Sequence, residues 1–253
     1  MHHVSLEETV NLAILAGEVM LINGAETSRA EETMDHIAWA CGASAVNSFV
    51  IPTGVFLTVS NMEGRSLTAM RRIKYRTIDL ERIAKVNELS RRLVDYRIEF
   101  TEAQNLLNNI AQERAVLPAV ISIGASGVIG GGYAVVQSGG SGEMVGGFIA
   151  ASGVSWIASL VTGFHGGQFI YEFLGGLVAA FIGILLQNYY SELNRDVIIV
   201  AGLMPLVPGM VITNAIRDII AGDLLSGISR GLEATLTAVA VAMGVVIALS
   251  FGK

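Results

Sequence analysis

The side chains best suited to bind a small solute lie close together near the C-terminus. Thr213, Asn214, Arg217 and Asp218 occupy positions i, i+1, i+4 and i+5, so on a helix they cover one sector. A guanidinium binds a carboxylate, hydroxyl and amide groups bond to polar atoms of a solute, and a carboxylate can carry a proton. This spacing indicates a polar binding surface along one side of a helix.

An apolar segment long enough to cross a bilayer precedes this sector and contains two prolines. Pro205 and Pro208 lack an N–H, so in a continuous helix the carbonyls of Ala201 and Met204 would have no donor, and Gly209 relaxes the backbone further. In hydrocarbon an unpaired carbonyl is costly, so a broken span is tolerated only where protein or a wet cavity surrounds it. Transporters often hold their substrate at such a break. We therefore predict that a broken helix carries the site.

Carboxylates continue beyond the polar sector, and we expect Asp218, Asp223 or Glu233 to exchange protons. Ionisable groups at membrane depth are costly and usually functional. An alternative is that Asp218 and Asp223 form ordinary ion pairs with Arg217 and Arg230 at a cytoplasmic interface, closing a loop. Both interpretations remain open. The predicted substrate-binding residues are Pro205, Pro208, Gly209, Thr213, Asn214 and Arg217.

Composition divides the chain into a water-soluble part and a membrane part. Of 253 residues, 52% are hydrophobic and 15% charged, and residues 1–115 hold 12 of the 16 Lys+Arg and 15 of the 22 Asp+Glu. We predict a cytoplasmic α+β domain at residues 1–115 and a transmembrane domain at residues 116–253. A net charge of -6 argues against a nucleic-acid partner, and the single cysteine, Cys41, excludes an internal disulfide and a cysteine-cluster metal site.

The periodicity of hydrophobic residues predicts the helices and strands of both parts. Helical spacing covers residues 6–22 and 79–94 and, after a Ser28–Glu31 capping box, the segment that ends near Gly42. Alternation with a period of two between residues 45 and 73 predicts an antiparallel meander of three strands. Five apolar spans follow at residues 116–137, 144–163, 170–190, 197–216 and 229–251, which predicts a five-helix bundle with a broken fourth helix. The lysines and arginines before the first span place the N-terminal domain in the cytoplasm of a multi-pass protein of the inner or plasma membrane.

Three stretches together resemble the threonine/serine exporter family, in its split, YjjP-like form. They are GAETSRAEETM at 24–34, DLERIAKVNELSRRL at 79–93 and PLVPGMVITNAIRDIIAGDLLSGISRGLEA at 205–234. The resemblance implies a secondary exporter, driven by the proton gradient, of small amino acids such as threonine and serine or of a dicarboxylate such as succinate. We expect no cofactor and no metal site. Single-chain members carry about ten spans, so this chain should need a second small membrane subunit or another copy of itself.

Two further functions were compared with export. A membrane-anchored hydrolase would use Glu31, Asp35, His36 or Cys41 of the N-terminal domain, but His36 and Cys41 are five apart on an otherwise apolar helix, which favours packing. No nucleotide-hydrolysis or zinc-protease motif occurs in the sequence. The N-terminal domain could also regulate transport or dock a partner, which is compatible with export.

Overall fold

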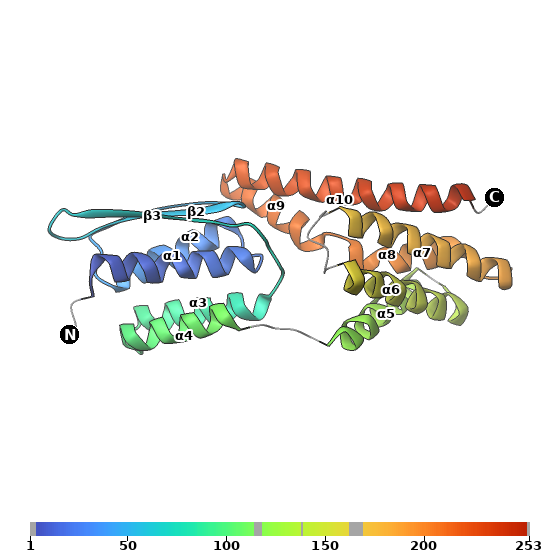
Figure 1. The fold of residues 1–253 in the computed structure, drawn as a ribbon, viewed down its shortest axis with the longest axis horizontal. Helices are drawn as coiled ribbons and strands as arrows, with labels where there is room; N and C mark the ends of the chain where they lie inside the picture. Colours follow the sequence, from blue (N-terminus) through green and yellow to red (C-terminus); the bar gives the residue numbers. More distant parts are fainter. Residues whose placement is uncertain (1–3, 114–117, 138, 162–168, 252–253) are drawn as a thin grey trace. The chain divides into compact units, whose positions relative to one another are not determined.

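The computed structural model describes residues 4–113, 118–137, 139–161 and 169–251 (Figure 1). The chain divides into two compact units. Unit 1 holds residues 1–114 and 210–232, and unit 2 holds residues 115–209 and 233–253. The predicted domain boundary between residues 115 and 116 falls outside the described residues. Residues 210–232, which the sequence assigns to the membrane part, pack within unit 1.

Four helices and a small sheet form the N-terminal part of unit 1. The three strands pair antiparallel in the order β1-β2-β3, which confirms the predicted meander. The sheet lies on one side of α1 and α2, while α3 and α4 lie on the other (Figure 1). The elements are α1 (Leu6–Ile22), α2 (Thr27–Ala40), β1 (Ala45–Ile51), β2 (Gly54–Ser60), β3 (Ser66–Arg72), α3 (Leu80–Val94) and α4 (Phe100–Gln112).

Helix α1 is the centre of this core because it contacts both layers. Ile14, Met20 and Leu21 are fully buried, and they pack in one cluster with Ile37 of α2 and Leu57 of β2. A helix that is apolar around most of its circumference is stable only when it is enclosed. The sheet and the α3–α4 pair supply that enclosure, so the N-terminal part has a core of its own.

The helix caps differ from the prediction. A capping box begins α1, where the Ser5 hydroxyl accepts from the Glu8 N–H and the Glu8 carboxylate accepts from the Ser5 N–H. The box predicted at Ser28 and Glu31 is wrong, because α2 begins at Thr27 and its N-cap, Glu26, makes no side-chain capping bond. The Glu31 carboxylate instead accepts from the Val50 N–H of β1 at 2.8 Å. The first turn of α2 is capped from elsewhere in unit 1.

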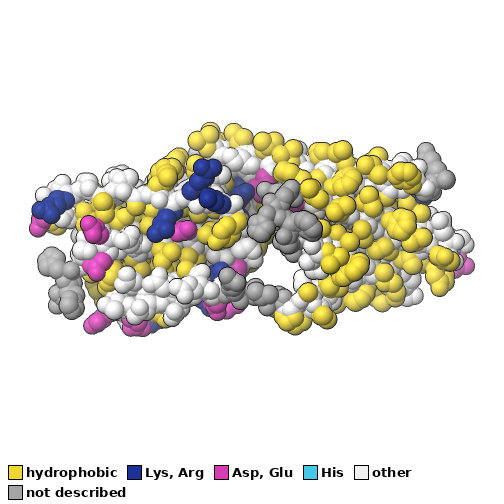
Figure 2. Space-filling view, in the orientation of Figure 1, with side chains coloured by type: hydrophobic (Ala, Val, Ile, Leu, Met, Phe, Trp, Pro, Cys, Tyr) yellow, Lys and Arg dark blue, Asp and Glu magenta, His cyan; other side chains and the backbone are white. Residues whose placement is uncertain are grey.

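Unit 2 consists of apolar helices. Among the described residues, four helices are long and apolar enough to cross a membrane, or five spans if α8 and α9 count as one interrupted span. Hydrophobic side chains cover the visible face of unit 2, and charged side chains are spread over unit 1 (Figure 2). The four helices are α5 (Ala119–Val136), α6 (Ser141–Val161), α7 (Ile170–Tyr189) and α10 (Leu224–Phe251).

Small residues let the helices of unit 2 approach closely. A Cβ added at Gly147 would meet the Ala201 Cβ and the Gly130 carbonyl oxygen, each at 2.9 Å, so α5, α6 and α8 meet where no side chain fits. Such contacts are typical of helix packing in membranes.

The segment around the prolines is interrupted and the connection after it is tight. Helix α8 (Arg195–Leu203) ends in a 3-10 turn, η1 (Met204–Leu206), and α9 (Gly209–Ala221) begins directly after Pro208. The last helix begins at Leu224, five residues before the predicted start of the fifth span. The predicted long connection is therefore a turn at Gly222, whose φ of +94 glycine tolerates readily. Asp223 donates its N–H to the Asp218 carbonyl at 2.8 Å and closes this α9–α10 hairpin.

Candidate functional site

Side chains of α9 and α10 meet the turn between α1 and α2. This turn, residues 24–27, begins at Gly24, which has a φ of +90. The Asn214 amide donates to the Gly24 carbonyl at 2.8 Å, and the Arg230 guanidinium donates to the Ala25 carbonyl at 2.8 Å. All of these residues belong to unit 1. Two side chains of the C-terminal segment thus bind consecutive carbonyls of the α1–α2 turn.

Asp218 caps the N-terminus of α2. Its carboxylate oxygens accept from the Thr27 N–H at 3.1 Å and from the Thr27 hydroxyl at 3.2 Å. The Arg230 Nε lies 3.0 Å from the second oxygen, and the side chains of Asp218 and Arg230 are 0% and 4% exposed. A carboxylate at a helix N-terminus meets unpaired N–H groups and the positive end of the helix dipole. Asp218 therefore replaces the missing local cap of α2.

We call Asn214, Asp218 and Arg230, together with the turn at residues 24–27, the buried polar cluster. A buried charge is tolerated when it is paired and hydrogen-bonded, and Asp218 meets both conditions. The alternative interpretation allowed ion pairs among Arg217, Asp218, Asp223 and Arg230. Asp218 pairs with Arg230, whereas Arg217 pairs with Glu26 outside that set. Asn214 and Asp218 of the predicted polar sector lie with Arg230 in this cluster, and all three bind protein groups that the sequence did not indicate.

A small cavity lies beside the buried polar cluster. It has a volume of about 210 Å³ and is bounded by the α1–α2 turn, the start of α3 and the first turns of α9. Arg217 forms an ion pair with Glu26, and both side chains line the cavity together with Thr213. The other lining residues are Gly24, Ala25, Arg29, Leu80, Ile83, Met210 and Asn214. The cavity has room for a small solute, and its lining includes charged side chains and one hydroxyl group, that of Thr213.

The remaining predicted site residues lie in different places. Pro205 belongs to η1, Pro208 precedes α9, and Gly209 is the first residue of α9. Asp223 lies in the α9–α10 turn and Glu233 lies on the part of α10 that belongs to unit 2. Of the predicted substrate-binding residues, Thr213, Asn214 and Arg217 line the cavity of unit 1.

An acidic residue of α2 adds to the charge near the cluster. Burial raises the pKa of Glu31, the bond from the Val50 N–H lowers it, and the charges of Asp223, Asp35 and Asp218 raise it further. The sequence suggested Glu31 only for a capping box with Ser28 and for a hydrolase. The stretch GAETSRAEETM contained the signal, since it holds the turn, Glu26, Arg29 and Glu31, but nothing local connects it to α9.

The residues proposed for hydrolysis are poorly arranged for it. Burial raises the pKa of the Cys41 thiol to about 11, so little reactive thiolate is present at neutral pH. His36 is exposed on α2, whereas Cys41 is partly buried at its C-cap. The N-terminal part thus gives a cysteine nucleophile no support.

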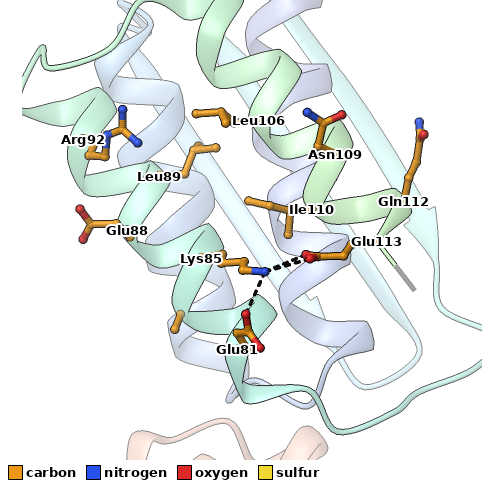
Figure 3. Close-up of a pocket in the computed structure, with 11 residues that line it drawn as sticks. Glu81, Lys85, Glu88, Leu89, Arg92, Leu106, Asn109, Ile110, Gln112 and Glu113 are labelled. Atoms are coloured by element: carbon orange, nitrogen blue, oxygen red, sulfur yellow. Dashed lines mark hydrogen bonds and ion pairs between the residues drawn. The ribbon is translucent and has the colours of Figure 1, made fainter. Parts of the chain in front are cut away.

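A larger open groove lies between α3 and α4, with a volume of about 880 Å³ (Figure 3). Its lysine, Lys85, is held by Glu113 at 2.9 Å and Glu81 at 3.0 Å, and these hydrogen bonds raise the pKa of Lys85. Leu89, Leu106 and Ile110 form much of the remaining wall. No predicted site residue lines this groove, and its lysine is already bound to two carboxylates.

Comparison with known proteins gives one family and several relatives, all described as transporters or exporters. The model of a family described as "Putative threonine/serine exporter" matches residues 11–252. A protein of Escherichia coli named "Probable succinate transporter subunit YjjP" is 25% identical over 94% of this chain and 93% of its own length. A protein of the same name from Klebsiella aerogenes is 25% identical over 94% of this chain and 92% of its own length.

A longer relative matches only in part. A Mycobacterium tuberculosis protein named "Probable threonine/serine exporter" is 19% identical over 96% of this chain, but the match covers 46% of that protein. No solved structure matches the chain.

Proposed function

The chain belongs to the threonine/serine exporter family, and on this premise we propose that it is a subunit of a secondary exporter driven by the proton gradient. The solute is a small amino acid such as threonine or serine, or a small dicarboxylate such as succinate. The observation that carries the proposal is the family match over residues 11–252, which includes the apolar helices and the interrupted α8–α9 segment. The names of the relatives support both kinds of solute.

The proposed membrane arrangement has five spans, with α8 and α9 as one broken span, and the N-terminal domain in the cytoplasm. The concentration of lysine and arginine before the first span supports that orientation. A second small membrane subunit, or a second copy of this chain, completes the transporter. The E. coli relative is named a subunit, and the M. tuberculosis relative is about twice as long as its match to this chain, which supports a two-part assembly.

The proposed substrate-binding groups are those at the break and along α9. Pro205, Pro208 and Gly209 open the helix, and Thr213, Asn214 and Arg217 offer polar groups to a carboxylate-bearing solute. A solute would compete with protein groups here, because the Asn214 amide donates to the Gly24 carbonyl and Arg217 is paired with Glu26.

The proposed proton-coupling groups are Asp218, Asp223 and Glu233. Asp218 is the weakest candidate because it is held by Arg230 and Thr27. Glu233 gains support from a neighbour in unit 2. The carboxylates of Glu172 and Glu233 are close enough to interact electrostatically. Among the described residues, the Oε2 atom of Glu172 is buried and has no hydrogen-bond partner.

Flux measurements in vesicles test the proposal. We expect vesicles that contain the chain and its partner to show gradient-driven export of labelled threonine or succinate. Glu233→Gln and Asp223→Asn should reduce this coupled flux at least about tenfold while leaving counterflow exchange in place, because exchange needs no net proton movement.

Glu192→Gln is the matched control, since Glu192 is an exposed carboxylate between α7 and α8. Undiminished coupled flux in both carboxylate variants would exclude Asp223 and Glu233 as coupling groups. Absence of flux for amino acids and dicarboxylates with the partner present would overturn the proposal of export.

A further inference from the structure

We propose that the cavity of unit 1 binds the carboxylate of a small solute, with Arg29 and Arg217 as its anion-binding groups and Glu26 as an internal competitor. The inference rests on the proposed function and adds to it. It assigns half of the site to the N-terminal part of the chain, because Glu26 and Arg29 come from the start of α2 and Ile83 from α3.

The charges around the cavity favour an anion. Two arginines, Arg29 and Arg217, and one acidic residue, Glu26, line the cavity. Within the described part of the chain the Arg29 guanidinium forms no ion pair, whereas Arg217 is paired with Glu26. The cavity therefore carries one cation in excess. An arginine fork binds a carboxylate through two parallel hydrogen bonds, so this excess selects a carboxylate-bearing solute.

The pair of Arg217 and Glu26 can open. The side chain of Arg217 is 58% exposed and that of Glu26 is 22% exposed. An ion pair with this much access to water is weak. The carboxylate of a solute can replace that of Glu26 at Arg217 while water solvates Glu26, so the exchange costs little.

Size and polarity also fit a small solute. A volume of about 210 Å³ is below the range of about 300–1,000 Å³ that is usual for sites of drug-sized ligands. Thr213 and Asn214 place a hydroxyl and an amide on one wall, and Leu80, Ile83 and Met210 make the rest apolar. Such a wall accepts a short carbon chain with one or two polar ends.

The cavity adjoins the buried polar cluster through two neighbouring residue pairs. Glu26 precedes Thr27, which bonds to Asp218, and Arg217 precedes Asp218 along α9. A solute that draws Arg217 away from Glu26 therefore acts on residues directly attached to the α2 cap. Binding in this cavity would be felt by α9, which follows the proline break.

Equilibrium binding of radiolabelled L-threonine and succinate to the full chain in lipid nanodiscs tests the inference. We expect at least one of the two to bind, and Arg29→Gln and Arg217→Gln each to weaken binding at least about tenfold, because each removes a charged hydrogen-bond donor. Glu26→Gln should tighten binding a few-fold by removing the competitor. A gain of affinity cannot result from misfolding.

Arg65→Gln is the matched control, since Arg65 is an exposed arginine whose pair, Glu63, lies in the β2–β3 turn. Comparison of L-threonine, a zwitterion, with succinate, a dicarboxylate, shows which class of solute the cavity prefers. Unchanged binding in Arg29→Gln and Arg217→Gln, or no binding of either solute, would overturn the inference.

Flux measurements on the same variants distinguish failure of the carboxylate-binding cavity from failure of the proposed export function. Coupled flux with unchanged affinity in the arginine variants rejects the cavity and keeps the exporter. Binding that depends on both arginines in a chain without flux keeps the cavity and rejects the exporter.

Discussion

Arg230 and Asp218 form the most deeply buried ion pair of the chain's described ion pairs, and each also binds the backbone of the α1–α2 turn. A pair of this kind contributes little compared with well-packed apolar residues, because both charges have lost their water. Loss of one partner is far more costly, since the other charge stays buried without compensation. The pair therefore specifies where α9 and α10 lie against α2.

Arg230→Met should lower the free energy of unfolding by about 3–5 kcal/mol, because it leaves the Asp218 carboxylate buried without its cation. Fluorescence of Trp39, in a Trp156→Phe background, reports unfolding of unit 1 in detergent. Addition of Asp218→Asn should recover part of the loss.

Arg65→Met serves as the control, because its pair with Glu63 is mostly exposed and should contribute at most about 1 kcal/mol. Equal effects of Arg230→Met and Arg65→Met would show that the buried pair does not hold α9 and α10 in place.

At the level of elements, the turn between α1 and α2 connects the two halves of unit 1. Gly24 allows a backbone conformation with a φ of +90, and this directs the carbonyls of Gly24 and Ala25 to side chains of α9 and α10. Helix α2 needs no capping side chain of its own, because Asp218 supplies one. The α1–α2 turn and the α9–α10 hairpin are therefore interdependent.

Gly24→Ala should destabilise unit 1 more than Gly42→Ala. Both glycines have a φ of +90, so both substitutions carry the cost of a left-handed residue, about 1–2 kcal/mol. A Cβ at Gly24 would also lie 3.3 Å from the Thr77 carbonyl oxygen, whereas a Cβ at Gly42 meets nothing within 4 Å. Thermal unfolding followed by Trp39 fluorescence makes the comparison. Identical losses would show that the turn adjusts freely.

At the level of the whole molecule, the N-terminal part contacts the C-terminal segment directly. Its α1–α2 turn binds the hairpin that follows the interrupted segment, and it supplies Glu26 and Arg29 to the cavity. All of these residues belong to unit 1. The structure thus gives the N-terminal part a direct means of acting on α9.

Removal of residues 1–113 should speed amide hydrogen exchange in α9, because Asn214, Asp218 and Arg230 lose their backbone partners and the helix loses its packing surface. Exchange in α5 and α6 should stay slow, since those helices pack against each other in unit 2, and they provide the internal control. Mass spectrometry of the full and shortened chains measures both regions. Unchanged exchange in α9 would show that the N-terminal part does not stabilise this helix.

The sequence by itself determined the elements. Helix α1 has the predicted bounds, the meander has its three strands, and the apolar segments form helices, because periodicity of two or 3.6 and turn residues act over short stretches of chain. Errors in the elements fell at a cap and a connection. At Ser28 the cap of α2 comes from the distant Asp218, and after Arg217 the chain forms a tight local turn at Gly222.

Only the tertiary structure decided what the polar residues of α9 meet. Asn214, Asp218 and Arg230 bind groups that lie 190, 191 and 205 positions away in the chain. Residue types and spacing indicated that Asn214 and Asp218 share one polar sector of a helix, since that follows from the helical repeat, but they did not place Arg230 of α10 beside them. No periodic pattern connects α9 with the start of α2, because their pairing depends on how the core of unit 1 brings the two segments together.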